Sequence, residues 1–228
     1  MLKQDLHLVE CTPKHRKNKM TTTVDIFHPA QEHALLRQTV RDFVKEHVEP
    51  QALEHDQHER FNLFLFRQLD ELGLLGITVP EKYGEAGMDT VAAVIAAEEI
   101  SASDPGFCLA YLAHAILFVN NFCRNANADQ RERYLEQVIS GAWVGGMCMT
   151  EPAAGTDLLG MKPKRSGVGM PIILLFITNG ALDDTTLGDI FLVYAKTDRG
   201  LSSFVVERGS PDFPWGSDCT ARRACVPQ

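Results

Sequence analysis

The residues of this 228-residue chain that could do chemistry are concentrated in one short segment, 147–157, which reads Met-Cys-Met-Thr-Glu-Pro-Ala-Ala-Gly-Thr-Asp. Such a run of small and polar residues offers backbone N–H groups, and the hydroxyl of Thr150, to a ligand. Cys148 lies inside the segment, but no base is placed beside it in the sequence, so we expect a buried filler and not a nucleophile. The segment therefore predicts ligand binding, with an ordinary helix-to-strand connection as the alternative.

Other kinds of site have less support. His55-Asp56-Gln57-His58 could place two imidazoles on one helical face, but no third ligand is signalled, so a solvated helix end is expected and no metal site. The six cysteines are scattered without a CxxC pair, which suggests neither a zinc site nor a disulfide framework and fits a reducing compartment. His114 lies in an apolar run and is expected to be a core histidine with satisfied hydrogen bonds. There is no G-x-G-x-x-G, P-loop or Ser-His-Asp string.

Composition excludes several classes of protein. The formal net charge is −8 and no basic stripe follows any expected element, which argues against nucleic-acid binding. The longest apolar run, 171–177, has the length of a strand, so no membrane-spanning segment is expected. Residues 1–27 lack the apolar region of a secretory signal, and acidic residues make them a poor transit peptide; we expect a disordered extension.

Hydrophobic periodicity predicts an α+β protein, helical to residue 145 and β-rich afterwards. One helix is expected to end or kink at Pro50, one to end at Gly73, and a third to be capped by Asp89 or Thr90. The expected helices cover 31–48, 61–72 and 90–100, then a run through 107–123 whose start is suggested by Asp104-Pro105, and last 130–139, capped by Asp129. Two strands are expected at 189–194 and 201–206, joined by a turn at 198–200.

Several local strings, in the correct order, resemble the acyl-CoA dehydrogenase family across residues 28–209. The segment 147–157 is similar to the flavin loop of that family, and the isovaleryl and other short-chain types are the most similar. The resemblance implies a helical domain at 28–145 followed by a middle β domain at 146–209. The matching segments are 71–84, 97–101, 134–135, 139–141, 147–157, 177–180 and 200–207.

The resemblance also implies the chemistry. Members of this family use FAD to remove a β-hydride from an acyl-CoA thioester while a glutamate removes the α-proton, and they pass the electrons to an electron-transfer flavoprotein. They act in fatty-acid or branched-chain amino-acid catabolism, in the mitochondrial matrix of eukaryotes or the bacterial cytoplasm. None of Glu46, Glu49, Glu98 or Glu99 matches the catalytic base of the family, so no catalytic residue is assigned.

By the same resemblance, nine residues are expected to line the site. Backbone groups of Met147 and Met149 and the Thr150 hydroxyl would bind the flavin, Gly155 would allow close approach, and Thr156 would lie near the pyrophosphate and CoA. Phe176 takes the place of the usual tryptophan beside the flavin, although alone it would be read as a core residue. The remaining three are Thr178 for the flavin and, unless they form a solvated turn, Asp198 and Arg199 for CoA.

Two departures from the family pattern remain. The segment between Thr156 and Phe176 is shorter than expected, and Pro171 disfavours a central strand there. Residues 210–228 form an atypical tail, which we interpret as an out-of-frame reading, and the C-terminal helical domain that carries the base and the oligomer core is expected to be absent. A non-catalytic flavin-binding or interaction fragment, and an acyl-CoA oxidase, therefore stay open as alternatives.

Overall fold

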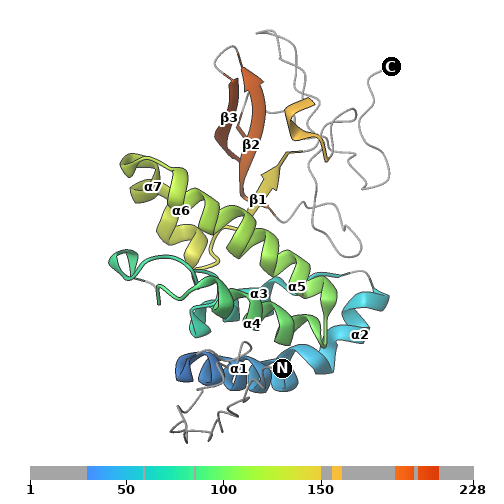
Figure 1. Ribbon diagram of the computed structural model, residues 1–228. Helices are drawn as coiled ribbons and strands as arrows, with labels where there is room; N and C mark the ends of the chain where they lie inside the picture. Colours follow the sequence, from blue (N-terminus) through green and yellow to red (C-terminus); the bar gives the residue numbers. More distant parts are fainter. Residues whose placement is uncertain are drawn as a thin grey trace, which may run out of the picture.

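The chain forms a layered helical domain with a small β-sheet standing on one side of it (Figure 1). The computed structural model describes residues 30–58, 60–84, 86–149, 156–160, 188–197 and 200–210. The helices are α1 (Gln31–Phe43), η1 (Val44–Val48), α2 (Glu49–Gln57), α3 (Leu63–Gln68), η2 (Leu69–Leu72), η3 (Glu81–Tyr83), α4 (Thr90–Ser101), α5 (Pro105–Leu112), η4 (Ala113–Asn120), α6 (Asn121–Asn125), α7 (Ala128–Ile139) and, after the sheet begins, η5 (Leu158–Gly160).

The first three helical elements, α1, η1 and α2, run on without a break, and the direction of the helix changes between α1 and α2 (Figure 1). The π-helical turn η1 lies directly before α2, in which Pro50 occupies the first turn. Proline has no N–H to donate to the preceding turn, and kinks occur at prolines and at π turns. Pro50 therefore kinks the helix, one of the two outcomes that the sequence predicted.

Helix caps confirm most of the expected starts. The side chains of Asn62, Asp89 and Asp104 each accept a hydrogen bond from a backbone N–H of the first turn of α3, α4 and α5. The expected cap of α7 was wrong, because Asn127 and not Asp129 holds that position. Asn127 and Gln130 form a reciprocal capping box, with bonds of 2.8 and 3.0 Å, which starts the helix two residues earlier.

Replacing Asn127 with alanine is expected to lower the free energy of unfolding by about 1 kcal/mol, since the Gln130 N–H loses its side-chain acceptor and the reciprocal box is broken. The matched variant Asp129→Ala removes an acidic group from the same first turn without touching the cap, and it should cost about half as much or less. Urea denaturation of both variants measures the difference. An equal loss in both variants would contradict the capping box.

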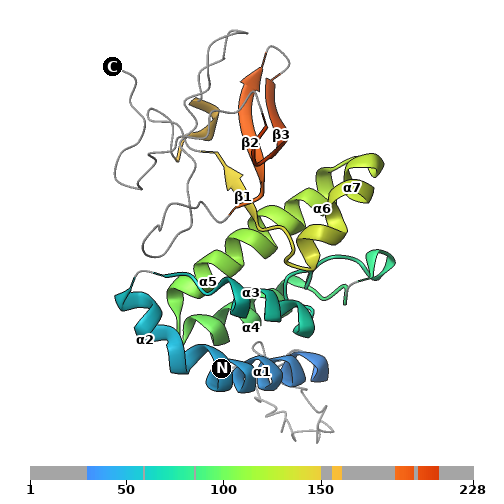
Figure 2. The ribbon, with the colours of Figure 1, turned by 180° about the vertical axis from the view of Figure 1, so that it is seen from behind.

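The longest helix is continuous from Pro105 to Asn125, through α5, η4 and α6, and it crosses between the lower helices and the sheet (Figures 1 and 2). By length and composition alone it could span a membrane, which corrects the expectation that no segment was long enough. However, 61% of its most apolar window is buried inside the protein. That burial is typical of a core helix, and it fits the position of this one between two layers.

Two hydrophobic clusters lie on either side of this helix. One joins it to α1, α3 and α4, and its fully buried members include Val40, Phe66, Leu69 and Tyr111. The other joins it to α7 and the sheet, and it includes Phe118, Phe122 and Ile190. The same helix thus contributes to both cores, so it couples the helical layer to the sheet.

The sheet has three described strands, β1 (Gly145–Cys148), β2 (Ile190–Thr197) and β3 (Gly200–Glu207), in the order β1-β2-β3. Both expected strands are confirmed as the antiparallel pair β2 and β3. Strand β1 was missed and replaces the first residues of the expected loop. It pairs in parallel with β2, with Met147 opposite Leu192, so its partner lies more than forty residues away in sequence.

Side chains of α7 fasten β3 to the helical layer. The Tyr134 hydroxyl donates to the Glu207 carboxylate at 2.5 Å, and an Arg133 guanidinium nitrogen lies 2.7 Å from the same oxygen. Beside them, the Asp189 carboxylate accepts the Val144 N–H at 2.9 Å. These contacts gather at one end of the sheet, where Gly145, Ile190 and Glu207 lie side by side, and those of Glu207 hold that end against α7.

Candidate functional site

The candidate site begins at β1, because this strand leads directly into the segment 147–157. Met147 and Met149 are half-buried, and Cys148 is almost completely buried. Burial raises the pKa of the Cys148 thiol to about 12, so the group stays protonated and unreactive at neutral pH. The expectation that Cys148 is a filler and not a nucleophile is confirmed.

The start of β1 lies tightly against the long helix. Gly145 has no side chain, and a Cβ built on it would come within 2.3 Å of the Phe118 ring. The Gly145 N–H donates to the His114 Nδ1 at 2.8 Å, and the His114 Nε2 lies 2.8 Å from the Val138 carbonyl oxygen. The expectation that His114 is a satisfied core histidine is confirmed.

A small polar contact lies beside Met147, between the sheet and the long helix. The Asn121 side-chain amide donates to the Tyr194 hydroxyl at 2.6 Å and lies 3.9 Å from the Met147 Sδ. Tyr194 shares a sheet face with Ile190 and Leu192, since residues two apart point the same way. This face packs on α6 and η4, which makes one wall of the region around Met147 rigid.

The segment 156–160 lies beside the far end of β2. Thr156 is exposed, and the Asp157 carboxylate accepts the Gly160 N–H at 3.0 Å to close the short turn η5. The Lys196 ammonium donates to the Leu159 carbonyl oxygen at 3.2 Å. The structure thus places Thr156 directly before a turn that is tied to β2, while Met147 and Met149 lie on and just after β1. The other six expected site residues, Thr150, Gly155, Phe176, Thr178, Asp198 and Arg199, lie outside the described residues.

None of the four glutamates considered as a catalytic base, Glu46, Glu49, Glu98 and Glu99, is placed by the described residues beside β1. Glu46, Glu49 and Glu98 are exposed on the outer surface of the helical layer. Glu99 is buried, and its carboxylate bonds the guanidinium groups of Arg37 at 2.5 Å and Arg41 at 2.8 Å. The hydrogen bond from Arg41 is the main reason that the pKa of Glu99 lies below its usual value. Glu99 is therefore a structural anion, which removes it as a proton acceptor.

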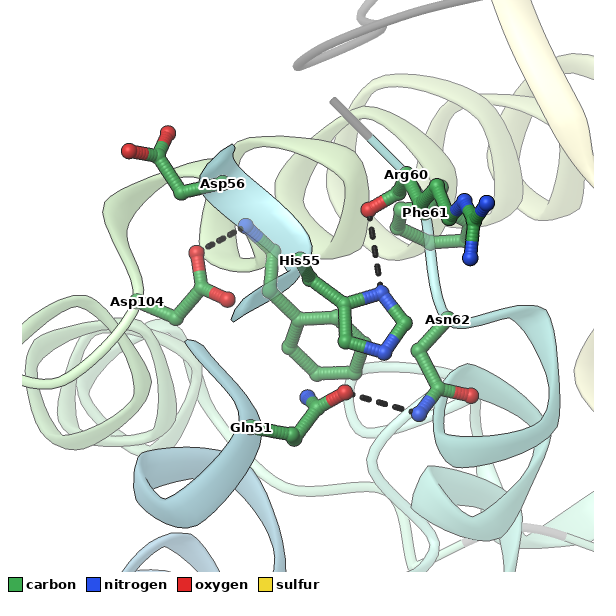
Figure 3. A pocket seen from close by; sticks show the side chains of 8 residues that line it. Gln51, His55, Asp56, Arg60, Phe61, Asn62 and Asp104 are labelled. Carbon is green, nitrogen blue, oxygen red and sulfur yellow. Dashed lines mark hydrogen bonds between the residues drawn. The ribbon is translucent and has the colours of Figure 1, made fainter. Parts of the chain in front are cut away.

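A separate polar cavity opens where α2, α3 and α5 meet (Figure 3). Its volume is about 30 Å³, which holds one or two water molecules and excludes a flavin or a nucleotide. His55 lines it with its Nδ1 3.1 Å from the Arg60 carbonyl oxygen, and the Gln51 Oε1 accepts from the Asn62 amide at 2.8 Å. Gln51 Nε2 is buried and finds no protein partner in the described part of the chain, so a water molecule is its natural acceptor.

The expected helix-end histidines do not form part of a larger cluster in the described part of the chain. His55 and His58 are the pair, and the ring of His58 contacts the Glu54 carbonyl oxygen at 2.8 Å. Among the described residues, no group of three or more His, Cys, Asp and Glu side chains comes together as a metal site would require.

Sequence reasoning missed two contributors to the region around β1. Tyr194 was assigned to a strand, but its partner Asn121 is 73 residues away, and nothing local signals the pairing. His114 was placed in the core, but its role at β1 could not be foreseen while β1 itself was unrecognised. An apolar helix that carries a single histidine is the signal that could have directed attention to it.

Comparison with known proteins adds to this geometry. Residues 30–142 match the model of the acyl-CoA dehydrogenase N-terminal domain. The chain is 42% identical over 197 residues to the mitochondrial isovaleryl-CoA dehydrogenase of Pongo abelii, covering 81% of this chain and 45% of that protein. It is 32% identical over 199 residues to the short-chain specific acyl-CoA dehydrogenase of Clostridium acetobutylicum, covering 83% and 51%.

A solved structure shows the same arrangement. The glutaryl-CoA dehydrogenase of Mycobacterium smegmatis in complex with FADH2 aligns with a TM-score of 0.67 and 26% identity, covering 80% of this chain and 47% of that one. The chain spans about half the length of the curated relatives it matches.

Proposed function

Because this chain belongs to the acyl-CoA dehydrogenase family, we propose that its sheet and the segment 147–157 form part of an FAD site for the α,β-dehydrogenation of an acyl-CoA thioester. The observation that carries the proposal is the position of β1, which places Met147 in the sheet and Met149 directly after it, at the start of this segment. A helical domain at 28–145 and a β domain at 146–209 would share the site.

The described residues fit a flavin in two respects. Met147 and Met149 are two residues apart, so their backbone groups point toward the same edge of the strand and can bind one planar ligand edge together. Among the described strands, β1 has a neighbour on one side only; on its other edge the Gly145 N–H bonds His114, and the backbone groups of Met147 and Met149, farther along the same edge, would bind the ligand. The bound flavin would supply the hydride acceptor.

We assign the remaining contacts by family. The hydroxyls of Thr150 and Thr156 and the backbone at Gly155 would follow the flavin toward its pyrophosphate. Phe176 and Thr178 would complete the flavin pocket. Asp198 and Arg199 would contact CoA. The chain supplies no assigned base, so proton removal needs a group beyond the residues named.

The names of the relatives support a substrate class and a compartment for the proposed reaction. Matches named isovaleryl-CoA dehydrogenase indicate a short branched acyl group and branched-chain amino-acid catabolism, with the mitochondrial matrix as the compartment. An electron-transfer flavoprotein would accept the electrons, as is usual for this family.

The first experiment is the visible absorption spectrum of the purified 228-residue protein after incubation with FAD and desalting. A retained and perturbed flavin band is expected, because β1 is held in place by contacts within the described residues. A colourless protein would refute the FAD site. With flavin retained, reduction of an artificial electron acceptor by isovaleryl-CoA tests the dehydrogenase reaction. Formation of peroxide would indicate an oxidase. The absence of turnover would indicate a non-catalytic flavin-binding fragment.

A further inference from the structure

His114 is completely buried in η4, and both of its ring nitrogens have backbone partners. A backbone N–H only donates, so the Nδ1 that faces Gly145 must accept. A backbone carbonyl only accepts, so the Nε2 that faces Val138 must carry the proton. The two partners thus require one neutral tautomer of the imidazole. The edge-on contact with the Phe66 ring, at 5.2 Å between centroids, holds the ring plane in place.

The two bonds of His114 join three elements that are distant in sequence. Val138 lies in the last turn of α7, 24 residues away, and Gly145 is the first residue of β1, 31 residues away. A neutral imidazole suits this position because it holds one donor and one acceptor on opposite sides of a rigid ring. An apolar side chain of the same size would leave the Gly145 N–H buried without its acceptor, whereas the Val138 carbonyl oxygen would keep the Gly141 N–H as a donor at 3.3 Å.

The long helix also contacts Gly145 through a second residue, Phe118. Phe118 lies four residues after His114, on the same helical face, and it fills the space where a side chain of Gly145 would lie. The hydrogen bond therefore sets the distance of β1 from the helix, and the Phe118 ring prevents closer approach. Met147 follows only two residues later, about 7 Å along the strand, so a displacement of Gly145 reaches it directly.

We propose that His114 is a positioning residue for the flavin site, which fixes the place of β1 through the bond from the Gly145 N–H. The inference rests on the proposed function, because the groups that His114 would position for the flavin are the backbone groups of Met147 and Met149. His114 itself contacts no ligand in this arrangement. Its effect passes through two residues of strand.

Two conservative variants separate the bonds of His114. In His114→Asn, the side-chain oxygen can take the place of Nδ1 and still accept from Gly145. In His114→Gln, the side-chain nitrogen can take the place of Nε2 and donate to Val138, but Gly145 loses its acceptor. FAD affinity, measured by quenching of flavin fluorescence, should fall about tenfold in the Gln variant and about threefold or less in the Asn variant.

The control is Leu69→Ala, which creates a cavity in the other hydrophobic cluster and destabilises the fold away from β1. It should leave FAD affinity unchanged at temperatures where the protein remains folded. Equal affinities in the Gln and Asn variants, or a loss in the Gln variant no larger than that in Leu69→Ala, would overturn the proposal. If the unaltered protein binds no FAD, the proposed function itself fails.

A second measurement does not depend on FAD. In the flavin-free protein, amide hydrogen exchange at Gly145 should be faster in His114→Gln than in the unaltered protein or in His114→Asn. Unchanged exchange in the Gln variant would show that His114 does not hold β1, whatever the flavin result.

Discussion

Replacing Glu99 with alanine is expected to lower the free energy of unfolding by about 3 kcal/mol, because it leaves two guanidinium groups without their shared partner. The Glu99 side chain is 9% exposed, and that of Arg37 is 12% exposed. Arg37 Nε has no hydrogen-bond partner among the described residues, so this cation depends on its remaining contacts. The pair of arginines comes from α1 and the glutamate from α4, so the loss also loosens the packing of these two helices.

The matched control is Glu98→Ala, on the preceding residue of α4. Glu98 also contacts Arg37, at 2.7 Å, but its side chain is 57% exposed. Exposed ion pairs contribute about 1 kcal/mol or less. Guanidinium chloride would compete with these charges, so urea denaturation is the suitable measurement. A loss in Glu99→Ala no larger than that in Glu98→Ala would show that burial does not strengthen this contact.

Acidification is expected to destabilise the protein by about 3 kcal/mol between pH 6.5 and pH 4 through His114 alone. Burial lowers the pKa of His114 to about 4, from an ordinary value of 6.5, because the charged ring would lose its hydration. Above pH 6.5 the ring is neutral in both states. Below it, the unfolded chain binds a proton that the native state binds only near pH 4, so stability falls as the pH falls.

The control for this pH dependence is His114→Asn, which keeps an acceptor for Gly145 and does not titrate. Unfolding free energies of the two proteins, measured by urea denaturation across the window, should converge as the pH falls. Asp89 and Glu99 have pKa values below their usual range, so their effect comes at lower pH, where unfolded carboxylates begin to bind protons. Parallel curves for the two proteins would contradict the assignment to His114.

Local sequence determined the helices and their ends. A cap acts over three residues, so Asp89 and Asp104 could be recognised from the residues that follow them. The wrong cap at Asp129 is also a local error of two residues. Asn127 can accept the same hydrogen bond two residues earlier, and only the geometry of the turn selects between the two. The order of short strings along the chain was likewise enough to identify the family, which the match at 30–142 confirms.

Part of the candidate site could be predicted and part could not. The segment 147–157 was recognisable because its residue types and order are local. Strand β1 was not, since four residues with two glycines carry no strand signal, and its stability comes from pairing with β2 and from the helix behind it.

The contacts that set the energetics depended on tertiary structure alone. The sequence shows a histidine in an apolar run and a glutamate in an alanine-rich helix, but not what either one touches. The fold brings Gly145 to His114 across 31 residues and Glu99 to Arg41 across 58. Both are polar groups removed from water, whose free energy depends on partners at fixed distances. Only the packed chain supplies those partners, and so the sequence determined which family this protein belongs to, while the tertiary structure decided which partners its buried polar groups have.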